Sequence, residues 1–156
     1  MLVLRHAKAA AAQAGVGHHD RPLEDLGRRQ AASVGRLLRE EALVPDGIVC
    51  SSALRALETA RLAAEACGHD EQPFVTERLY AEDVEDWVTL FSDLPDSLRT
   101  VMIVGHNPGL EELVEKLTRR AEGLSPASFA CIDLPIDSWS ELHARVRGRL
   151  SGIWRL

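Results

Sequence analysis

The sequence predicts an α/β protein built around a mainly parallel β-sheet. Short apolar runs at residues 2–4 and 101–104 each stop just before polar residues, as buried parallel strands do. Between such runs lie longer stretches whose apolar side chains recur at helical spacing. This alternation of strands and helices is typical of a layered α/β sandwich.

The first half of the chain supplies two strands and two helices. The strand at residues 2–4 is an apolar run that stops at Arg5. Residues 28–41 are expected to form a helix because their apolar side chains share one helical face, and residues 54–67 repeat this pattern. Residues 47–50 give a weaker strand between them. Both helices are expected to cross over between parallel strands.

The second half continues the alternation. A strand near Phe74 and Val75 precedes a helix at residues 84–94, and the buried strand at residues 101–104 precedes an amphipathic helix at residues 110–117. Residues 128–134 are expected to form another strand, and residues 153–156 an edge strand. No repeat or linker interrupts the chain, so we expect a single domain over residues 1–156.

Composition narrows the classes of function. With 46% hydrophobic and 27% charged residues, the chain has the balance of a globular protein, and no apolar run is long enough to cross a bilayer. No signal-peptide pattern follows the first strand, so we expect a cytoplasmic protein without a membrane partner. A formal net charge of -6 argues against nucleic acid as a partner. The three cysteines are odd in number and lack a close pair, so neither a disulfide framework nor a zinc site is expected.

Polar side chains follow three of the expected strands. Arg5 and His6 follow the first strand, Ser51 and then Arg55 follow the strand at residues 47–50, and His106 follows the strand at residues 101–104. Ligands of open α/β sheets bind beyond the carboxyl ends of the strands. We therefore expect two arginines and two histidines to meet at one edge of the sheet.

This set of side chains suits phosphoryl transfer. Arg5 and Arg55 can each fork onto two phosphate oxygens, and nearby cations would keep His6 neutral and nucleophilic. His6 could then attack phosphorus and carry the phosphoryl group until water removes it. His106, close to the start of a helix, would add a donor to the same oxygens. No metal or organic cofactor is implied, because the arginines supply the positive charge.

At these residues the sequence resembles the histidine phosphatase superfamily, and within it the small SixA-type phosphohistidine phosphatases. The motifs that carry the resemblance are LRHAKA (4–9), DRPLEDLGRRQA (20–31), SSALRALETA (51–60), LYA (79–81) and VGHNPGLEELVEKL (104–117). The resemblance implies that His6 is the phosphorylated nucleophile and that Arg5, Arg55 and His106 form the phosphate pocket. It implies Arg21 as a further phosphate or substrate contact. It also implies a phosphoglycerate mutase-like three-layer sandwich, with helices on both faces and one antiparallel strand in the sheet.

The sequence departs from this family at two points. Ala7 stands where many members have glycine. Members that hydrolyse esters have a glutamate as proton donor in the segment after the third strand, and Ala81 takes that place here. Glu82 and Glu77 are the nearby candidates for a general acid.

The missing acid bears on the substrate. An alkoxide leaving group needs strong protonation, whereas imidazole, with a pKa of about 6.5, leaves phosphohistidine far more readily. The chain also lacks long insertions that would enclose a small metabolite. We therefore expect a protein phosphohistidine, such as that of a phosphorelay domain, as substrate and inorganic phosphate as product. A phosphomonoesterase acting on a small phosphorylated metabolite is the alternative.

Three other patterns in the sequence suggest different functions. Cys50 and Arg55 are one residue too close for the loop of a cysteine phosphatase, so Cys50 is not expected to act as nucleophile. His18 and His19 are adjacent and are not expected to share one metal ion. A binding module without turnover would use the same arginines and histidines, but it would have no need of the nucleophile His6.

Overall fold

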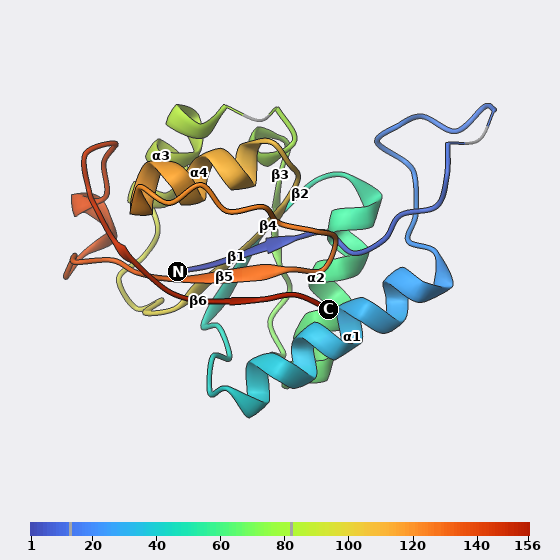
Figure 1. Ribbon diagram of the computed structural model, residues 1–156, viewed down its shortest axis with the longest axis horizontal. Coiled ribbons are helices and arrows are strands. Elements are labelled where there is room, and N and C mark those ends of the chain that lie inside the picture. Colours follow the sequence, from blue (N-terminus) through green and yellow to red (C-terminus); the bar gives the residue numbers. More distant parts are fainter. Residues whose placement is uncertain (13, 82) are drawn as a thin grey trace.

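A computed structural model describes residues 1–12, 14–81 and 83–156. It contains a six-stranded sheet in the order β3-β2-β4-β1-β5-β6, with helices on both faces (Figure 1). The strands are β1 (Leu2–Arg5), β2 (Gly47–Ser51), β3 (Phe74–Thr76), β4 (Val101–Gly105), β5 (Phe129–Asp133) and β6 (Arg149–Trp154). The helices are α1 (Asp25–Glu40), α2 (Leu54–Cys67), α3 (Val84–Ser92) and α4 (Gly109–Thr118), with the short 3-10 helices η1 (Glu77–Leu79) and η2 (Trp139–Glu141).

The sheet is parallel at its centre. β4 pairs in parallel with both β1 and β2, so that Met102 lies opposite Leu2 on one side and Ile48 on the other. β2 pairs in parallel with β3, whereas β5 pairs antiparallel with both β1 and β6. Within the described residues, β5 is therefore antiparallel to the remaining strands. This confirms the expected three-layer α/β sandwich with one antiparallel strand.

Both faces of the sheet are covered. Figure 1 shows α3 and α4 above the strands and α1 and α2 below them. Successive side chains of β1 alternate between the two layers, since Val3 packs with the α3 and α4 core while Leu2 and Leu4 pack with the α1 and α2 core. All three are fully buried, and burial of such a side chain contributes about 1.5–3 kcal/mol. Two-sided burial explains the unbroken apolar runs in the sequence.

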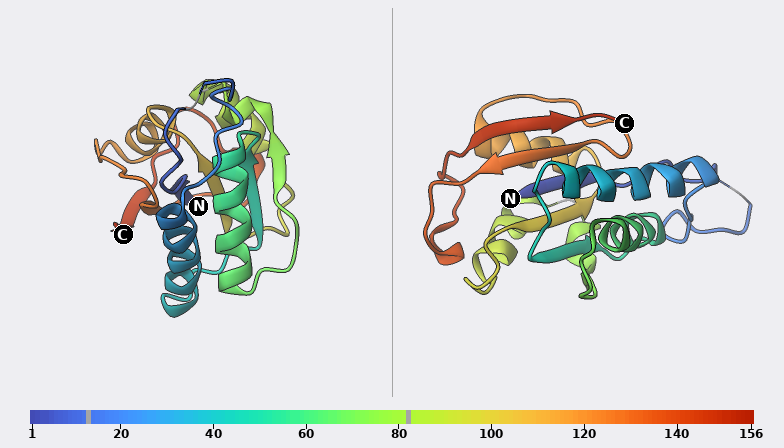
Figure 2. Two further views of the ribbon diagram at one scale, coloured as in Figure 1. Left: turned by 90° about the vertical axis from the view of Figure 1, so that its right-hand side faces the viewer. Right: turned by 90° about the horizontal axis from the view of Figure 1, so that it is seen from below.

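Helices α1 and α2 run side by side (Figure 2). A side chain at Gly35 of α1 would collide with the carbonyl oxygen of Ala63 in α2, so glycine permits the close approach. A side chain at Gly27 would likewise collide with the backbone of Lys8, in the loop after β1. The first turns of α1 are thus packed directly on the segment that leaves the sheet at His6. None of the described helices is long and apolar enough to cross a membrane.

Two elements differ most from the sequence-based expectation in where they begin. Helix α1 begins at Asp25 rather than at residue 28, and the backbone N–H of the preceding Glu24 donates to the Lys8 carbonyl at 3.1 Å. This long-range contact fixes the helix start, and no local pattern records it. Strand β6 covers Arg149–Trp154 rather than residues 153–156, because its polar first residues pair with β5 at the edge of the sheet.

Candidate active site

The carboxyl ends of β1, β2 and β4 bring the expected side chains together. The guanidinium of Arg55, in the first turn of α2, lies between two imidazoles. Its Nε donates to His6 Nε2 at 3.3 Å, and its Nη2 lies 3.1 Å from His106 Nδ1. The two imidazole centroids are 5.1 Å apart. The parallel strands thus place His6 and His106 on either side of one fixed positive charge.

The hydrogen bonds of His6 assign its tautomer. Nδ1 lies 2.7 Å from the carbonyl oxygen of Ala7, which can only accept, so Nδ1 carries the proton. Nε2 therefore has the free lone pair, and it points toward the Arg55 Nε–H. The Thr59 hydroxyl accepts from the Ala7 N–H at 3.0 Å and donates to the Arg55 carbonyl at 2.7 Å. Thr59 in this way couples the loop after β1 to the first turn of α2.

His106 is held by a second pair of contacts. Because Arg55 Nη2 can only donate, His106 Nδ1 accepts from it, and Nε2–H donates to the hydroxyl of Ser51 at 2.8 Å. Ser51 is fully buried and His106 is 4% exposed. Side-chain hydroxyls therefore contact the site from both β2 and α2.

Burial keeps both imidazoles neutral. The pKa of His6 is lowered to about 4, mainly by burial and further by the positive charges of Arg55, Arg5 and Arg21, against an opposing effect of its bond to the Ala7 carbonyl. The pKa of His106 is lowered to about 3 by burial and by the adjacent Arg55. At neutral pH, Nε2 of His6 is thus an unprotonated nitrogen beside positive charge.

Arg5 and Arg21 both lie close enough to this cluster for their charges to act on His6. Arg5 Nη1 donates to the carbonyl of Leu124 at 2.7 Å, while its buried Nε has no hydrogen-bond partner among the described residues. Arg21 donates through Nε and Nη2 to the Ala10 carbonyl at 2.9 and 2.6 Å. Its charge is close enough to lower the pKa of His6, although the guanidinium is held by the loop backbone.

The structure describes one of the two candidate acids. Glu82 lies outside the described residues. Glu77 is exposed in η1, and Ala81 follows Tyr80 after this turn. The Tyr80 ring meets His106 edge-on with centroids 5.7 Å apart, so the segment that should carry an acid presents a phenol to the site. The sequence interpretation missed Tyr80, although it belongs to the quoted LYA motif.

The histidines before Arg21 anchor a loop at the site. The carbonyl of His18 accepts from Arg55 Nη1 at 2.8 Å. His19 lies 3.1 Å from an oxygen of Asp20 through Nδ1 and 3.0 Å from the Ser52 hydroxyl through Nε2. The described residues contain no group of three or more side chains suited to hold a metal ion.

Cys50 lies in the core rather than in the site. Its side chain is fully buried, its thiol donates to the Ser51 carbonyl at 3.2 Å, and burial raises its pKa to about 12. A thiol in this state is a poor nucleophile.

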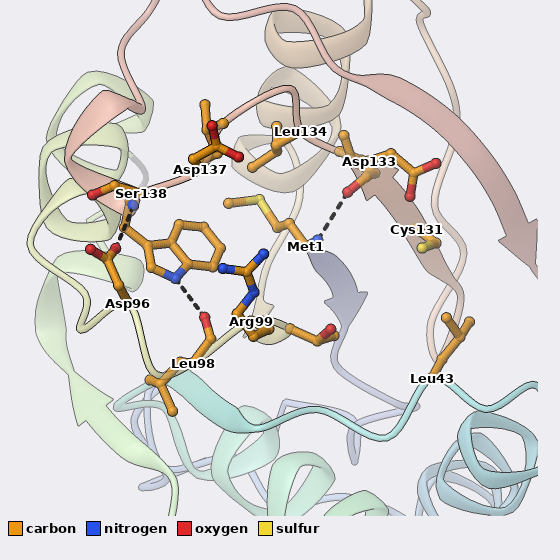
Figure 3. A pocket seen from close by; sticks show the side chains of 14 residues that line it. Met1, Leu43, Asp96, Leu98, Arg99, Cys131, Asp133, Leu134, Asp137 and Ser138 are labelled. Atoms are coloured by element: carbon orange, nitrogen blue, oxygen red, sulfur yellow. Dashed lines mark hydrogen bonds between the residues drawn. The ribbon is translucent and has the colours of Figure 1, made fainter.

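A separate hollow of about 290 Å³ lies at the opposite end of the strands (Figure 3). Met1, Asp133 and Trp139 are among its lining residues, and the Trp139 indole donates to the Leu98 carbonyl across it. It contains none of the residues that surround His6. The chemistry of this protein is therefore to be sought at the carboxyl ends of the strands.

Comparison with known proteins identifies the family of the chain. The model of the histidine phosphatase superfamily (branch 1) matches residues 1–125. An uncharacterized protein of Mycobacterium tuberculosis is 34% identical over 105 residues, which are 67% of this chain and 63% of that relative. The chain thus spans somewhat less than two thirds of this relative's length. An uncharacterized chloroplastic protein of Arabidopsis thaliana is 28% identical over 155 residues, covering 92% of this chain and 70% of that one.

Solved structures resemble the whole fold. A protein of Nakamurella multipartitia assigned as the phosphohistidine phosphatase SixA superposes with a TM-score of 0.84 at 26% identity, covering 99% of this chain and 95% of its own. The corresponding protein of Agrobacterium tumefaciens gives 0.83 at 26% identity, with 99% and 96% covered. A mycobacterial glucosyl-3-phosphoglycerate phosphatase shares the fold, with a TM-score of 0.71 at 20% identity and coverage of 99% and 97%. The family model matches residues 1–125 and the chain shares its fold with these structures, so this chain belongs to branch 1 of the histidine phosphatase superfamily.

Proposed function

We propose that the protein is a phosphatase that forms a covalent phosphohistidine on His6 and dephosphorylates a protein-borne phosphohistidine. The observation that carries the proposal is the hydrogen bond of His6 Nδ1 to the Ala7 carbonyl at 2.7 Å. It leaves the Nε2 lone pair facing Arg55, where a phosphate would lie. Likeness to two proteins assigned as SixA phosphohistidine phosphatases supports the substrate class.

Each residue has a part in the proposed reaction. His6 Nε2 attacks phosphorus, the P–N bond of the substrate breaks, and the departing imidazole takes up a proton from solvent water. Water then attacks the phosphorus of phospho-His6, which releases inorganic phosphate and restores the imidazole. Arg5 and Arg55 hold the equatorial oxygens, where their charge and N–H groups match the negative charge that spreads over these oxygens in the transition state, and His106 lines the same phosphate pocket beside Arg55. Arg21 is proposed as a contact further out.

The local charge allows the reaction to proceed without a metal. Arg55 lies between the two histidines, and Arg5 lies close enough to lower the pKa values of both. Guanidinium forks match phosphate oxygens and retain their charge at any working pH. We propose a metal-independent enzyme with phosphorylated protein and inorganic phosphate as its partners, working in the cytoplasm.

The leaving group favours phosphohistidine over an ester. Imidazole departs readily, whereas an alkoxide needs a strong proton donor. Glu77 is exposed, and on the same segment the Tyr80 ring lies edge-on to His106. A small phosphate ester remains the second candidate, with Glu82 or Glu77 as its acid.

The test compares two substrates in a chelator-treated, metal-free protein. Phosphate release is measured from a phosphohistidine-carrying protein domain and from a simple phosphate monoester. His6→Ala is the test variant, and His143→Ala, which removes an exposed histidine, is the matched control. We expect turnover of the phosphoprotein by the wild type and by His143→Ala, none by His6→Ala, and an acid-labile phosphoryl group that maps to His6.

Other outcomes are equally informative. Preference for the monoester would indicate a metabolite phosphatase and would make Glu77 and Glu82 the next residues to replace. Binding of the phosphoprotein without release or labelling would indicate a binding module. Normal turnover by His6→Ala would refute the proposed nucleophile.

A further inference from the structure

The segment between α4 and β5 holds Arg5 and His6 from one side. The Arg5 N–H donates to the Ser128 carbonyl at 3.0 Å, and the Ala127 N–H lies 3.2 Å from the carbonyl oxygens of both Arg5 and His6. The Arg5 guanidinium donates through Nη1 to the Leu124 carbonyl at 2.7 Å. Both the backbone and the side chain of Arg5 thus depend on the placement of residues 124–128.

One carboxylate fixes that segment. Glu111 Oε1, in the first turn of α4, accepts from the Leu124 N–H at 2.8 Å and from the Asn107 amide at 2.6 Å. The same Asn107 Nδ2 also donates to the Leu124 carbonyl at 2.9 Å. The Leu124 carbonyl therefore accepts from both Asn107 and Arg5, which uses both of its lone pairs.

We propose that Glu111 is a positioning residue for the phosphate site, acting on the Arg5 guanidinium through Leu124 and Asn107. This inference rests on the proposed phosphate site, because it assumes that Arg5 contacts the phosphoryl oxygens. A guanidinium binds two oxygens well only when its plane is fixed, and an anchored Nη1 removes the main rotation that would misalign it. Charge-assisted bonds to a carboxylate make Glu111 a strong anchor.

The neighbouring residue supplies a matched control. Glu112 lies in the same first turn of α4 and is exposed. Both carboxylates interact favourably with the helix N-terminus, so Glu112→Ala removes the same charge and the same helix effect without removing the bonds to Leu124. Glu111→Gln keeps an Oε1 acceptor for both donors and should restore the function that Glu111→Ala loses.

The experiment measures the affinity for tungstate, a tetrahedral oxyanion, by calorimetry in each variant. We expect Glu111→Ala to bind roughly tenfold more weakly than wild type, because a group coupled through one network typically changes affinity by this order. Glu111→Gln and Glu112→Ala should bind like wild type. In an Arg5→Ala background, Glu111→Ala should weaken tungstate binding no further.

The outcomes separate this inference from the proposed function. If the wild type binds tungstate and Arg5→Ala weakens binding, yet Glu111→Ala does not, only the positioning role is overturned. An equal loss from Glu111→Ala with and without Arg5 would show a general structural effect and also overturn it. If the wild type does not bind tungstate, both proposals fail. If Glu111→Ala does not fold, Asn107→Ala takes its place as the test variant. This substitution removes the bond to the Leu124 carbonyl and is expected to weaken tungstate binding in the same way.

Discussion

At the scale of single residues, the site is defined by which nitrogen of each histidine carries a proton. Arg55 can only donate, so it selects the lone pair of His6 Nε2 and of His106 Nδ1. The Ala7 carbonyl and the Ser51 hydroxyl take the remaining N–H groups. One guanidinium and two acceptors thus determine both tautomers, while burial and the nearby positive charges keep both rings neutral.

This arrangement predicts low titration midpoints in the free protein. His6 should titrate near pH 4 and His106 near pH 3, below the ordinary value of about 6.5, and NMR shifts of the ring Hε1 protons would show this. The folded state disfavours protonation, so the stability contributed is complete above pH 6.5 and is lost as the pH falls toward 4 and 3. His6→Asn and His106→Asn assign the signals. Midpoints near 6.5 would contradict the burial argument.

The sequence predicts the arginines and histidines of the site better than their hydrogen-bond partners. Arg5, His6 and His106 follow buried strands, and the carboxyl ends of parallel strands must meet at one edge, so their meeting could be anticipated. Ser51 and Thr59 could not be assigned in this way. A hydroxyl finds its partner through side-chain direction and helix placement, which only the packed structure determines.

At the scale of elements, the contact of α1 with the loop after β1 joins the scaffold to the site. The Glu24 N–H donates to the Lys8 carbonyl, and Gly27 packs against the same residue. The helical pattern predicted α1 but placed its start too late, because this contact is made across the fold. Helix α2, whose ends depend on local residues such as Gly68 in a left-handed conformation at its C-terminus, begins and ends where the sequence predicted.

Two glycines of α1 allow this link to be tested. A methyl group at Gly27 must displace the backbone of Lys8, two residues after His6, whereas one at Gly35 must displace α2 at Ala63. We expect Gly27→Ala and Gly35→Ala each to lower the free energy of unfolding by about 1–3 kcal/mol. Only Gly27→Ala should also weaken tungstate binding. Denaturant unfolding and calorimetry measure the two effects, and an equal loss of affinity in Gly35→Ala would show that stability alone is responsible.

At the scale of the whole molecule, one sheet serves two cores. Leu4 and Val104 pack toward α1 and α2, whereas Val3 and Ile103, their neighbours in the same strands, pack toward α3 and α4. If either core loses its packing, one face of the central strands is exposed, and the other core is built on the same strands. The single domain expected over residues 1–156 is therefore proposed to unfold as one unit.

The tryptophans allow each layer to be followed separately. Trp87, a residue of α3, is fully buried, and Trp154 stacks on Phe129 on the opposite face of the sheet with ring centroids 4.7 Å apart. A variant with Trp139 and Trp154 replaced by phenylalanine reports on the first layer, and one with Trp87 and Trp139 replaced reports on the second. In urea, the fluorescence of each variant should change together with its own far-UV circular dichroism, which controls for the stability lost by substitution. A shared sheet leaves no route by which one core unfolds alone, so the two signals are expected to coincide. If fluorescence and circular dichroism changed at different urea concentrations in either variant, the two layers would be separate folding units.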